Sequence, residues 1–161
     1  MDIRSKVVIV TGAARGNGQQ FARSFAAAGA FVVAADISDC SNTLDLIKTG
    51  GAAGIGVRLD VRDTASAHDM VATATREFGR IDALVNNAAL YGALRGGRFD
   101  AIPEADWDAA MAVNVKGIWN CCKAAVPAMR DAGGGASSIS PRSPRPTVCP
   151  LLCIIRPRRR R

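Results

Sequence analysis

Within residues 1–135, short apolar runs alternate with longer segments whose apolar residues recur at helical spacing. Consecutive apolar residues are typical of strands that are covered on both faces, whereas apolar residues three or four positions apart predict one face of a helix. The pattern predicts strands over residues 6–10, 30–35, 54–59 and 81–85. It predicts helices over residues 19–28, 43–48, 64–78 and 104–129.

Strands that alternate with helices build β-α-β units, and their right-handed crossovers produce a parallel sheet covered by helices. We therefore predict the α/β fold class, with a doubly wound parallel sheet. The sheet is expected to hold about the first four or five strands and to be incomplete at its C-terminal side. In the long helical segment, Trp107 and Trp119 are expected to be packing anchors.

A glycine-rich loop lies between the first predicted strand and the first predicted helix. It reads Thr-Gly-Ala-Ala-Arg-Gly-Asn-Gly, with glycines at Gly12, Gly16 and Gly18. In this context a tight turn lets backbone N–H groups approach a pyrophosphate, and the helix N-terminus adds partial positive charge. The loop lacks the Lys-Ser/Thr pair of a nucleoside-triphosphate P-loop. A glycine-rich turn without a ligand is the alternative.

An acidic residue, Asp36, ends the second predicted strand. A carboxylate at this place accepts hydrogen bonds from the ribose hydroxyls of adenosine and repels a 2′-phosphate, which favours NAD over NADP. Arg15 in the glycine loop could still meet a phosphate, so NADP is the less favoured cofactor and is not excluded. The alternative interpretation of Asp36 is a solvated loop acid.

The charge of the chain is unevenly distributed. Residues 1–135 contain 14 Lys and Arg and 14 Asp and Glu, whereas residues 136–161 contain seven Arg, no acidic residue and five of the seven prolines. This shift predicts a dinucleotide-binding domain over residues 1–135 and a Pro/Arg-rich tail over residues 136–161, expected to be disordered. The arginine-rich end of the tail lacks an aromatic stacking platform, so no nucleic-acid partner is expected.

Neither a membrane span nor a secretory signal is indicated by the sequence. It has no run of about 18 apolar residues, and its N-terminus lacks the long apolar segment and small-residue cleavage site of a signal peptide. The five cysteines show no metal-ligand spacing, so no metal site is predicted. A cytoplasmic protein with reduced thiols and no membrane partner is therefore expected.

Together these motifs resemble the short-chain dehydrogenase/reductase family. The glycine loop is similar to its TGxxxGxG signature, and Asp60-Val61 resembles its adenine-contacting pair. The segment that begins at Asn86 resembles the family's NNAG motif, with Ala89 in place of glycine. The resemblance implies a Rossmann-type fold and an oxidoreductase that transfers hydride between NAD and a small-molecule alcohol or ketone. It also implies a homo-oligomer, with the long helical segment at a subunit interface.

The resemblance implies roles for individual residues. Asn87 is expected to hold the third and fourth strands together and to lie along the cofactor, and Val113 is expected to touch its nicotinamide side. Asn114 matches the asparagine of the family's catalytic tetrad, expected to bend its helix and bind a water in a proton relay; an exposed helix asparagine is the alternative. The predicted cofactor-binding residues are Gly12, Arg15, Gly16, Asn17, Gly18, Asp36, Ile37, Asp60, Val61, Asn87, Ala88, Ala89 and Val113.

The family's other catalytic residues have no match in the sequence. The family uses a serine that polarises the substrate oxygen, a tyrosine as general acid/base, and a lysine four residues later that lowers the pKa of the tyrosine. The only tyrosine is Tyr91 and the last lysine is Lys123, so the chain contains no Tyr-x3-Lys. Ser137, Ser138 and Ser140 lie near the place of the family's serine and are interpreted as loop serines without a role.

A shifted reading frame accounts for the composition of the tail. One permitted set of codons for residues 136–145, started one base earlier, encodes Arg-Ile-Val-Asn-Ile-Ser-Ser-Val-Ala-Ala, a strand of the family's type that carries its serine. The same shift permits tyrosine in place of Ile155 and lysine in place of Arg159, at the family's spacings. Two functions therefore stay open: an NAD-dependent oxidoreductase, or a non-catalytic NAD-binding fragment.

Overall fold

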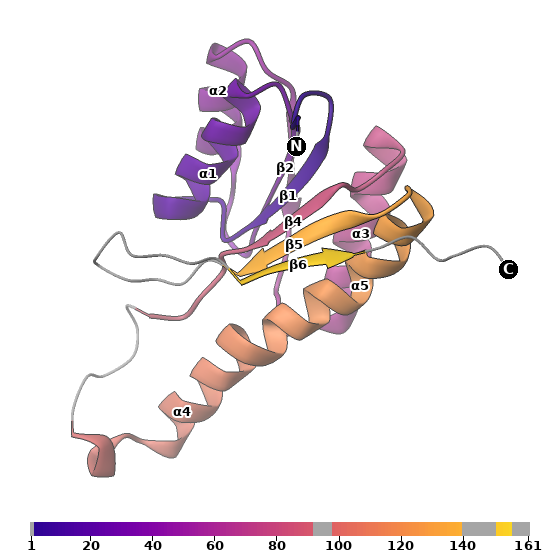
Figure 1. Cartoon of the computed structure of the whole chain (residues 1–161). Coiled ribbons are helices and arrows are strands. Elements are labelled where there is room, and N and C mark those ends of the chain that lie inside the picture. The colour runs from indigo at the N-terminus through magenta and orange to yellow at the C-terminus, as the bar shows by residue number, and fades with distance from the viewer. Residues whose placement is uncertain (1, 92–97, 140–150, 156–161) are drawn as a thin grey trace, which may run out of the picture.

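The computed structural model describes residues 2–91, 98–139 and 151–155, which form one sheet with helices on both faces (Figure 1). The strands are β1 (Val7–Thr11), β2 (Phe31–Asp36), β3 (Gly54–Arg58), β4 (Ala83–Asn86), β5 (Gly135–Ile139) and β6 (Leu151–Ile155). The helices are α1 (Gly16–Ala27), α2 (Ser41–Thr49), α3 (Thr64–Phe78), α4 (Glu104–Met111) and α5 (Gly117–Asp131), with short helical turns η1 (Phe99–Ala101) and η2 (Ala112–Lys116).

The strand order of the sheet is β3-β2-β1-β4-β5-β6. Strands β1 to β5 pair in parallel, which confirms the predicted doubly wound parallel sheet. The chain first runs outward from β1 to β3 and then returns to the other side of β1 at β4. In open parallel sheets, ligands bind at the carboxyl ends of the strands where the order reverses in this way. The expected place for a ligand is therefore the carboxyl end of β1 and β4.

The central strand β1 is buried on both faces because helices cover both sides of the sheet. Ile9 packs in a cluster with Met70 of α3 and Met129 of α5. Val8, on the opposite face, packs in a cluster with Phe25 of α1. Successive side chains of a strand point to opposite faces, so a run of apolar residues serves both layers. Figure 1 shows α1 and α2 on one side of the sheet and α3 and α5 on the other.

The predicted helix over residues 104–129 is interrupted. It divides into α4, the π-helical turn η2 and α5, which continues to Asp131. Hydrophobic spacing does not reveal a single π-helical turn, because the apolar pattern continues through it. The expectation for the two tryptophans is wrong: Trp107, on α4, which has no buried residue, is 53% exposed, and Trp119, on α5, is 55% exposed.

Two parts of the predicted disordered tail are strands in the structure. Residues 136–139 belong to β5, which pairs with β4, and β6 pairs antiparallel with β5. Strand pairing uses backbone groups, which explains why Ala-Ser-Ser-Ile forms a strand without a strand-like side-chain pattern. Ser137 and Ser138 therefore lie on a strand and not in a loop. Ser140 lies outside the described residues, and the division of the chain at residue 135 stays a prediction.

Candidate functional site

A cleft of about 340 Å³ lies at the carboxyl ends of β1, β2, β3 and β4, around the point where the strand order reverses. The predicted cofactor-binding residues in its lining are Gly12, Arg15, Asp36, Ile37, Asp60, Val61, Ala88, Ala89 and Val113. Other predicted residues do not line it, namely Gly16, Asn17, Gly18, Asn87 and Asn114. The structure thus brings residues from four separate loops and one helical turn to one concave surface.

A second cavity of about 430 Å³ lies beside the cleft, between the start of α2 and the edge strand β3. It contains Cys40, where burial together with the charges of Asp36 and Asp39 raises the pKa of the thiol to about 11. The thiol is therefore protonated at neutral pH and is a poor nucleophile. Of the predicted cofactor-binding residues, Ile37 alone lines this cavity, so the smaller cleft is the candidate site.

The glycine loop takes a shape that requires its glycines. Gly12 has φ +66°, in the left-handed region that favours glycine. A Cβ atom at Gly18 would collide with the carbonyl oxygen of Gly12 and would lie 2.5 Å from Nδ2 of Asn87. Among the described residues, no side chain caps the start of α1 and no acidic residue lies in its first turn. Backbone N–H groups at this helix start are therefore available to an anion.

Asn87 ties the end of β4 to the end of β1. Its backbone N–H donates to Oγ1 of Thr11 at 3.0 Å, and its Nδ2 donates to the carbonyl oxygens of Thr11 and Gly12 at 3.0 and 3.1 Å. The expectation that Asn87 joins the third and fourth strands is therefore wrong, because β1 and not β3 is the neighbour of β4. Oδ1 of Asn87 is buried and has no hydrogen-bond partner among the described residues. Such an orphan acceptor is suited to a bound ligand or water.

The carboxylate of Asp36 is oriented by two backbone N–H groups. Oδ2 accepts a hydrogen bond from Ala14 N–H at 3.0 Å, and Oδ1 accepts one from Ser38 N–H at 2.9 Å. The first bond comes from the glycine loop, so the acid at the end of β2 is fixed relative to the loop after β1. Each carboxylate oxygen can accept a further hydrogen bond, which leaves capacity for a ligand in the cleft.

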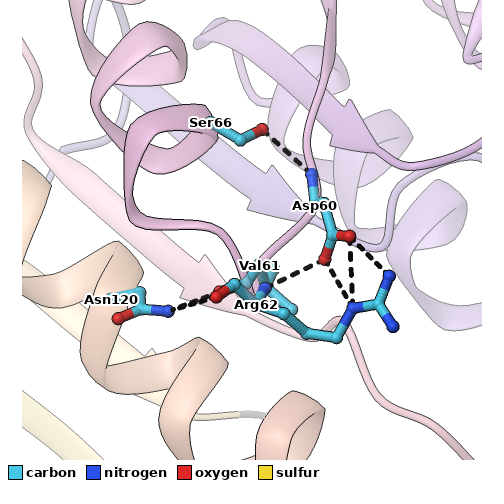
Figure 2. Close-up of polar contacts among 5 residues, drawn as sticks. All are labelled: Asp60, Val61, Arg62, Ser66 and Asn120. Atoms are coloured by element: carbon cyan, nitrogen blue, oxygen red, sulfur yellow. Dashed lines mark hydrogen bonds and ion pairs between the residues drawn. The ribbon is translucent and has the colours of Figure 1, made fainter.

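Asp60, in the loop after β3, is paired with Arg62 (Figure 2). The guanidinium donates from Nη2 to Oδ2 at 2.6 Å and from Nε to Oδ1 at 2.9 Å, and the backbone N–H of Arg62 donates to Oδ1 at 3.0 Å. These hydrogen bonds from Arg62 hold the pKa of the Asp60 carboxyl below its usual value. The backbone N–H of Asp60 donates to Oγ of Ser66 at 3.0 Å. The carboxylate at this end of the cleft is therefore ionised and held in place.

Asn114 lies in the π-helical turn η2 and contacts the loop after β4. Its Oδ1 accepts a hydrogen bond from Leu90 N–H at 2.8 Å, and its Nδ2 donates to the carbonyl oxygen of Leu90 at 3.1 Å. The side chain is thus not an exposed helix amide. Leu90 lines the cleft, so Asn114 holds one wall of it through the backbone of Leu90. Extra turns of this kind occur frequently at functional sites.

The serines of β5 lie beside the sheet core. Ser137 is 5% exposed, and its Oγ accepts a hydrogen bond from Nδ2 of Asn86 at 3.2 Å. The same Oγ lies 3.4 Å from Sγ of Cys122 on α5. Neither Ser137 nor Ser138 lines the cleft.

Several residues of the cleft were not predicted from the sequence. Its lining also contains Ser38, Leu59, Arg62, Leu90 and Ala109. Asn120 on α5 bonds to the loop after β3. A signal for Arg62 exists, since an arginine two positions after an aspartate in a loop can fold back onto it. Leu90 and Asn120 depend on contacts between distant segments and carry no local signal.

The family model described as short chain dehydrogenase matches residues 6–140 of this chain. The chain belongs to this family. An uncharacterized NAD-dependent oxidoreductase of Mycobacterium tuberculosis is 34% identical over 152 residues, covering 85% of this chain and 54% of that protein. Oxidoreductase UcpA of Salmonella typhimurium is 42% identical over 128 residues, covering 79% of this chain and 48% of that protein.

Solved structures of the short chain dehydrogenase family share the fold. The crystal structure of a short-chain type dehydrogenase/reductase from Mycobacterium marinum superposes with a TM-score of 0.78 at 30% identity, covering 83% of this chain and 54% of that one. The chain therefore spans about half the length of the curated relatives it matches. In the part of the chain that the structure describes, no helix is long and apolar enough to cross a membrane.

Proposed function

We propose that the cleft binds NAD, and that this chain forms the dinucleotide-binding part of an oxidoreductase that transfers hydride between NAD and an alcohol or ketone. The observation that carries the proposal is the convergence of the glycine loop, Asp36 and the Asp60-Val61 pair on one cleft. The uncapped start of α1 and the orphan acceptor of Asn87 both fit a bound dinucleotide. The proposed cofactor is NAD because Asp36 faces the cleft as an anion that repels a 2′-phosphate.

Each part of the cleft is assigned one part of the dinucleotide. The N–H groups of the first turn of α1, over residues 16–18, bind the pyrophosphate, whereas those of Ala13 and Ala14 already donate to Ala35 and Asp36. Asp36 binds the adenosine ribose beside Ile37, and Asp60 with Val61 forms the adenine end. Bound NAD supplies the hydride acceptor. The nicotinamide end is formed by Ala88, Ala89 and Val113, which lie on the opposite wall.

Asn114 is proposed to assist proton transfer at the nicotinamide end. Its two hydrogen bonds to Leu90 fix the amide plane and leave one Nδ2 hydrogen free to hold a water. We further propose a cytoplasmic homo-oligomer without nucleic-acid partners. The family supports these proposals, and the contact of Asn114 with Leu90 in the cleft wall supports its place at the nicotinamide end.

The second candidate function is an NAD-binding protein without catalysis. It is favoured by the lack of a Tyr-x3-Lys sequence, which the family uses for proton transfer. An assay of NADH formation with a panel of secondary alcohols separates the two candidates. NADH formation by the purified chain supports the oxidoreductase, and NAD binding without NADH formation supports the second candidate.

Isothermal titration calorimetry tests NAD binding, which both candidate functions require. The purified chain is expected to bind one NAD per chain and to bind NADP more weakly. Circular dichroism on the same sample establishes that the chain is folded. A folded chain that binds neither dinucleotide contradicts the proposal.

A further inference from the structure

The first turn of α5 reaches the loop that forms the adenine end of the cleft. Asn120 is fully buried, and its Nδ2 donates to the carbonyl oxygens of Val61 and Arg62 at 2.9 and 3.2 Å. Its Oδ1 accepts a hydrogen bond from Oγ1 of Thr64 at 3.4 Å. Figure 2 shows Asn120 beside Val61 and Arg62, on the side away from the Asp60 carboxylate. A single side chain thus binds three positions of one short loop.

An asparagine matches this loop in its hydrogen-bonding groups. Two successive backbone carbonyl groups point at the side chain, and an amide NH₂ offers two donors for them. An aspartate would place an anionic oxygen against the same carbonyl oxygens. An apolar side chain would leave the buried carbonyl of Val61 and the partly buried carbonyl of Arg62 without this partner, which is unfavourable. The side-chain amide therefore fixes the path of the backbone from Val61 to Thr64.

Gly117 brings the helix close to the same loop. A Cβ atom at Gly117 would lie 2.6 Å from Cγ2 and 2.9 Å from Cβ of Val61. Val61 therefore rests directly on the backbone of α5, and it also lines the cleft. Any side chain at position 117 would push Val61 toward the cleft or lift the whole loop.

We propose that Asn120 and Gly117 are positioning residues that hold Asp60 and Val61 in place to recognise adenine. The inference rests on the proposed function, because it assumes that the cleft binds the adenosine half of NAD. Among the described residues, the other hydrogen bonds of Asp60 join it to nearby positions in sequence, namely Arg62, Asp63 and Ser66. Asn120 and Gly117 tie this loop to a distant element of the fold.

The same helical segment sets both walls of the cleft. Asn114, in η2, holds Leu90 on the wall after β4, and Asn120, in the next turn of α5, holds the wall after β3. The distance between the walls is therefore fixed by one continuous stretch of helix. Loss of either contact loosens one wall and leaves the other in place.

The test compares the binding of adenosine monophosphate and inosine monophosphate to the full chain by calorimetry. Adenine carries an exocyclic amino donor that a carboxylate accepts, whereas hypoxanthine carries a carbonyl oxygen at that position. The wild-type chain is expected to prefer adenosine monophosphate by about tenfold, and Asn120→Ala is expected to reduce this preference to about twofold. A general loss of stability lowers the affinity for both nucleotides and leaves their ratio unchanged.

Ser137→Ala is the matched control, because it removes another buried hydrogen bond outside the cleft. It is expected to keep the wild-type preference. If Asn120→Ala does not fold, Gly117→Ala decides, since alanine favours a helix and its Cβ atom displaces Val61.

An unchanged preference in the folded variants overturns the inference while the proposed function stands. Equal wild-type affinity for the two nucleotides overturns it as well. A folded wild-type chain that binds neither nucleotide nor NAD overturns both the inference and the proposed function.

Discussion

At the residue scale, two aspartates at opposite ends of the sheet have different tasks. Asp82, just before β4, is 3% exposed and accepts hydrogen bonds from Val7 N–H and from the guanidinium of Arg80. Asp36, at the carboxyl end of β2, is half-buried and faces the cleft. The first joins β1 to β4, and the second is available to a ligand. Substitution of Asp82 is therefore expected to change the stability of the fold, and substitution of Asp36 is expected to change cofactor binding.

Replacing Asp82 with asparagine is expected to lower the stability of the fold. Burial tends to raise the pKa of Asp82, but the hydrogen bonds from Arg80 and Val7 N–H and the charges of Arg80 and Lys6 lower it below 3.8 overall. A depressed folded-state pKa stabilises the fold above the unfolded pKa, and this contribution is lost as the pH falls through the folded value. Asp82→Asn is expected to reduce the free energy of unfolding by about 2 kcal/mol at neutral pH.

Thermal melts between about pH 7 and about pH 3 measure this effect. The wild-type Tm is expected to fall more steeply than that of Asp82→Asn below about pH 4, because only the wild-type chain has this carboxylate to protonate. Parallel pH profiles for the two proteins contradict the assignment.

Replacing Asp36 with alanine is expected to change cofactor preference. The variant loses the carboxylate that accepts the ribose hydroxyls and repels a 2′-phosphate, so its affinity for NAD should fall about tenfold. Its affinity for NADP should fall less, and calorimetry with both dinucleotides measures the ratio. Asp39→Ala is the control, since Asp39 is an exposed acid three positions away that does not line the cleft. An Asp36→Ala variant with an unchanged ratio contradicts the role of Asp36.

The sequence predicted the site residues that belong to short motifs. It missed residues whose role depends on contacts between segments far apart in the sequence. The glycine spacing and the acid at the end of β2 indicate the cleft because each can be recognised within a few residues after a predicted strand. The role of Asn87 was misjudged because it depends on which strand lies next to β4. Asn120 was missed because its partners lie 58 and 59 positions away.

At the scale of elements, the segment from α4 to α5 controls the geometry of the cleft. The sequence predicted it as one helix, since a π-helical turn leaves the apolar spacing nearly unchanged. The strand β5 was missed for a different reason. Its Ala-Ser-Ser-Ile sequence lacks the apolar run of a buried parallel strand, although backbone pairing with β4 holds it in the sheet.

Replacing Asn114 with alanine is expected to loosen the wall after β4. The Leu90 N–H loses its acceptor, so hydrogen exchange at Leu90 and its neighbours should become about tenfold faster. Mass spectrometry of exchanged peptides that cover residues 88–91 measures this change. Asn42→Ala, at an exposed position of α2, is the control and should leave these peptides unchanged. Equal protection in wild type and Asn114→Ala contradicts the proposed contact.

At the scale of the whole molecule, large apolar side chains are exposed along α4, η2 and α5. They are Trp107, Met111, Val115 and Trp119, each between 41% and 55% exposed. Exposed apolar residues of this size on neighbouring turns are typical of an interaction surface. We propose that a second copy of the chain covers them.

A double variant, Trp107→Ala with Trp119→Ala, is therefore expected to shift the chain toward monomers. Sedimentation velocity measures the oligomeric state at matched concentrations. The expected result is a dimer or larger species for the wild-type chain and a larger monomer fraction for the variant. A wild-type chain that is monomeric at all concentrations contradicts this prediction.

The composition after residue 135 leads to a prediction about the coding DNA. Ser137 is buried where a parallel strand usually carries an apolar residue, and the shifted reading frame permits isoleucine there. We expect the DNA read one base earlier to encode the family's serine, tyrosine and lysine downstream of this position. Stop codons in that frame, or the lack of these residues, refute the frameshift.

Titration of the isotope-labelled chain with NAD, followed by amide chemical shifts, tests directly whether this cleft binds the dinucleotide. The largest shifts are expected in the glycine loop, at Asp36 to Ser38, at Asp60 to Arg62 and at Ala88 to Leu90. Smaller shifts are expected at the second cavity, around Leu44 and Val57. A folded chain without shifts, or with its largest shifts outside the cleft, contradicts the claim that this cleft binds NAD.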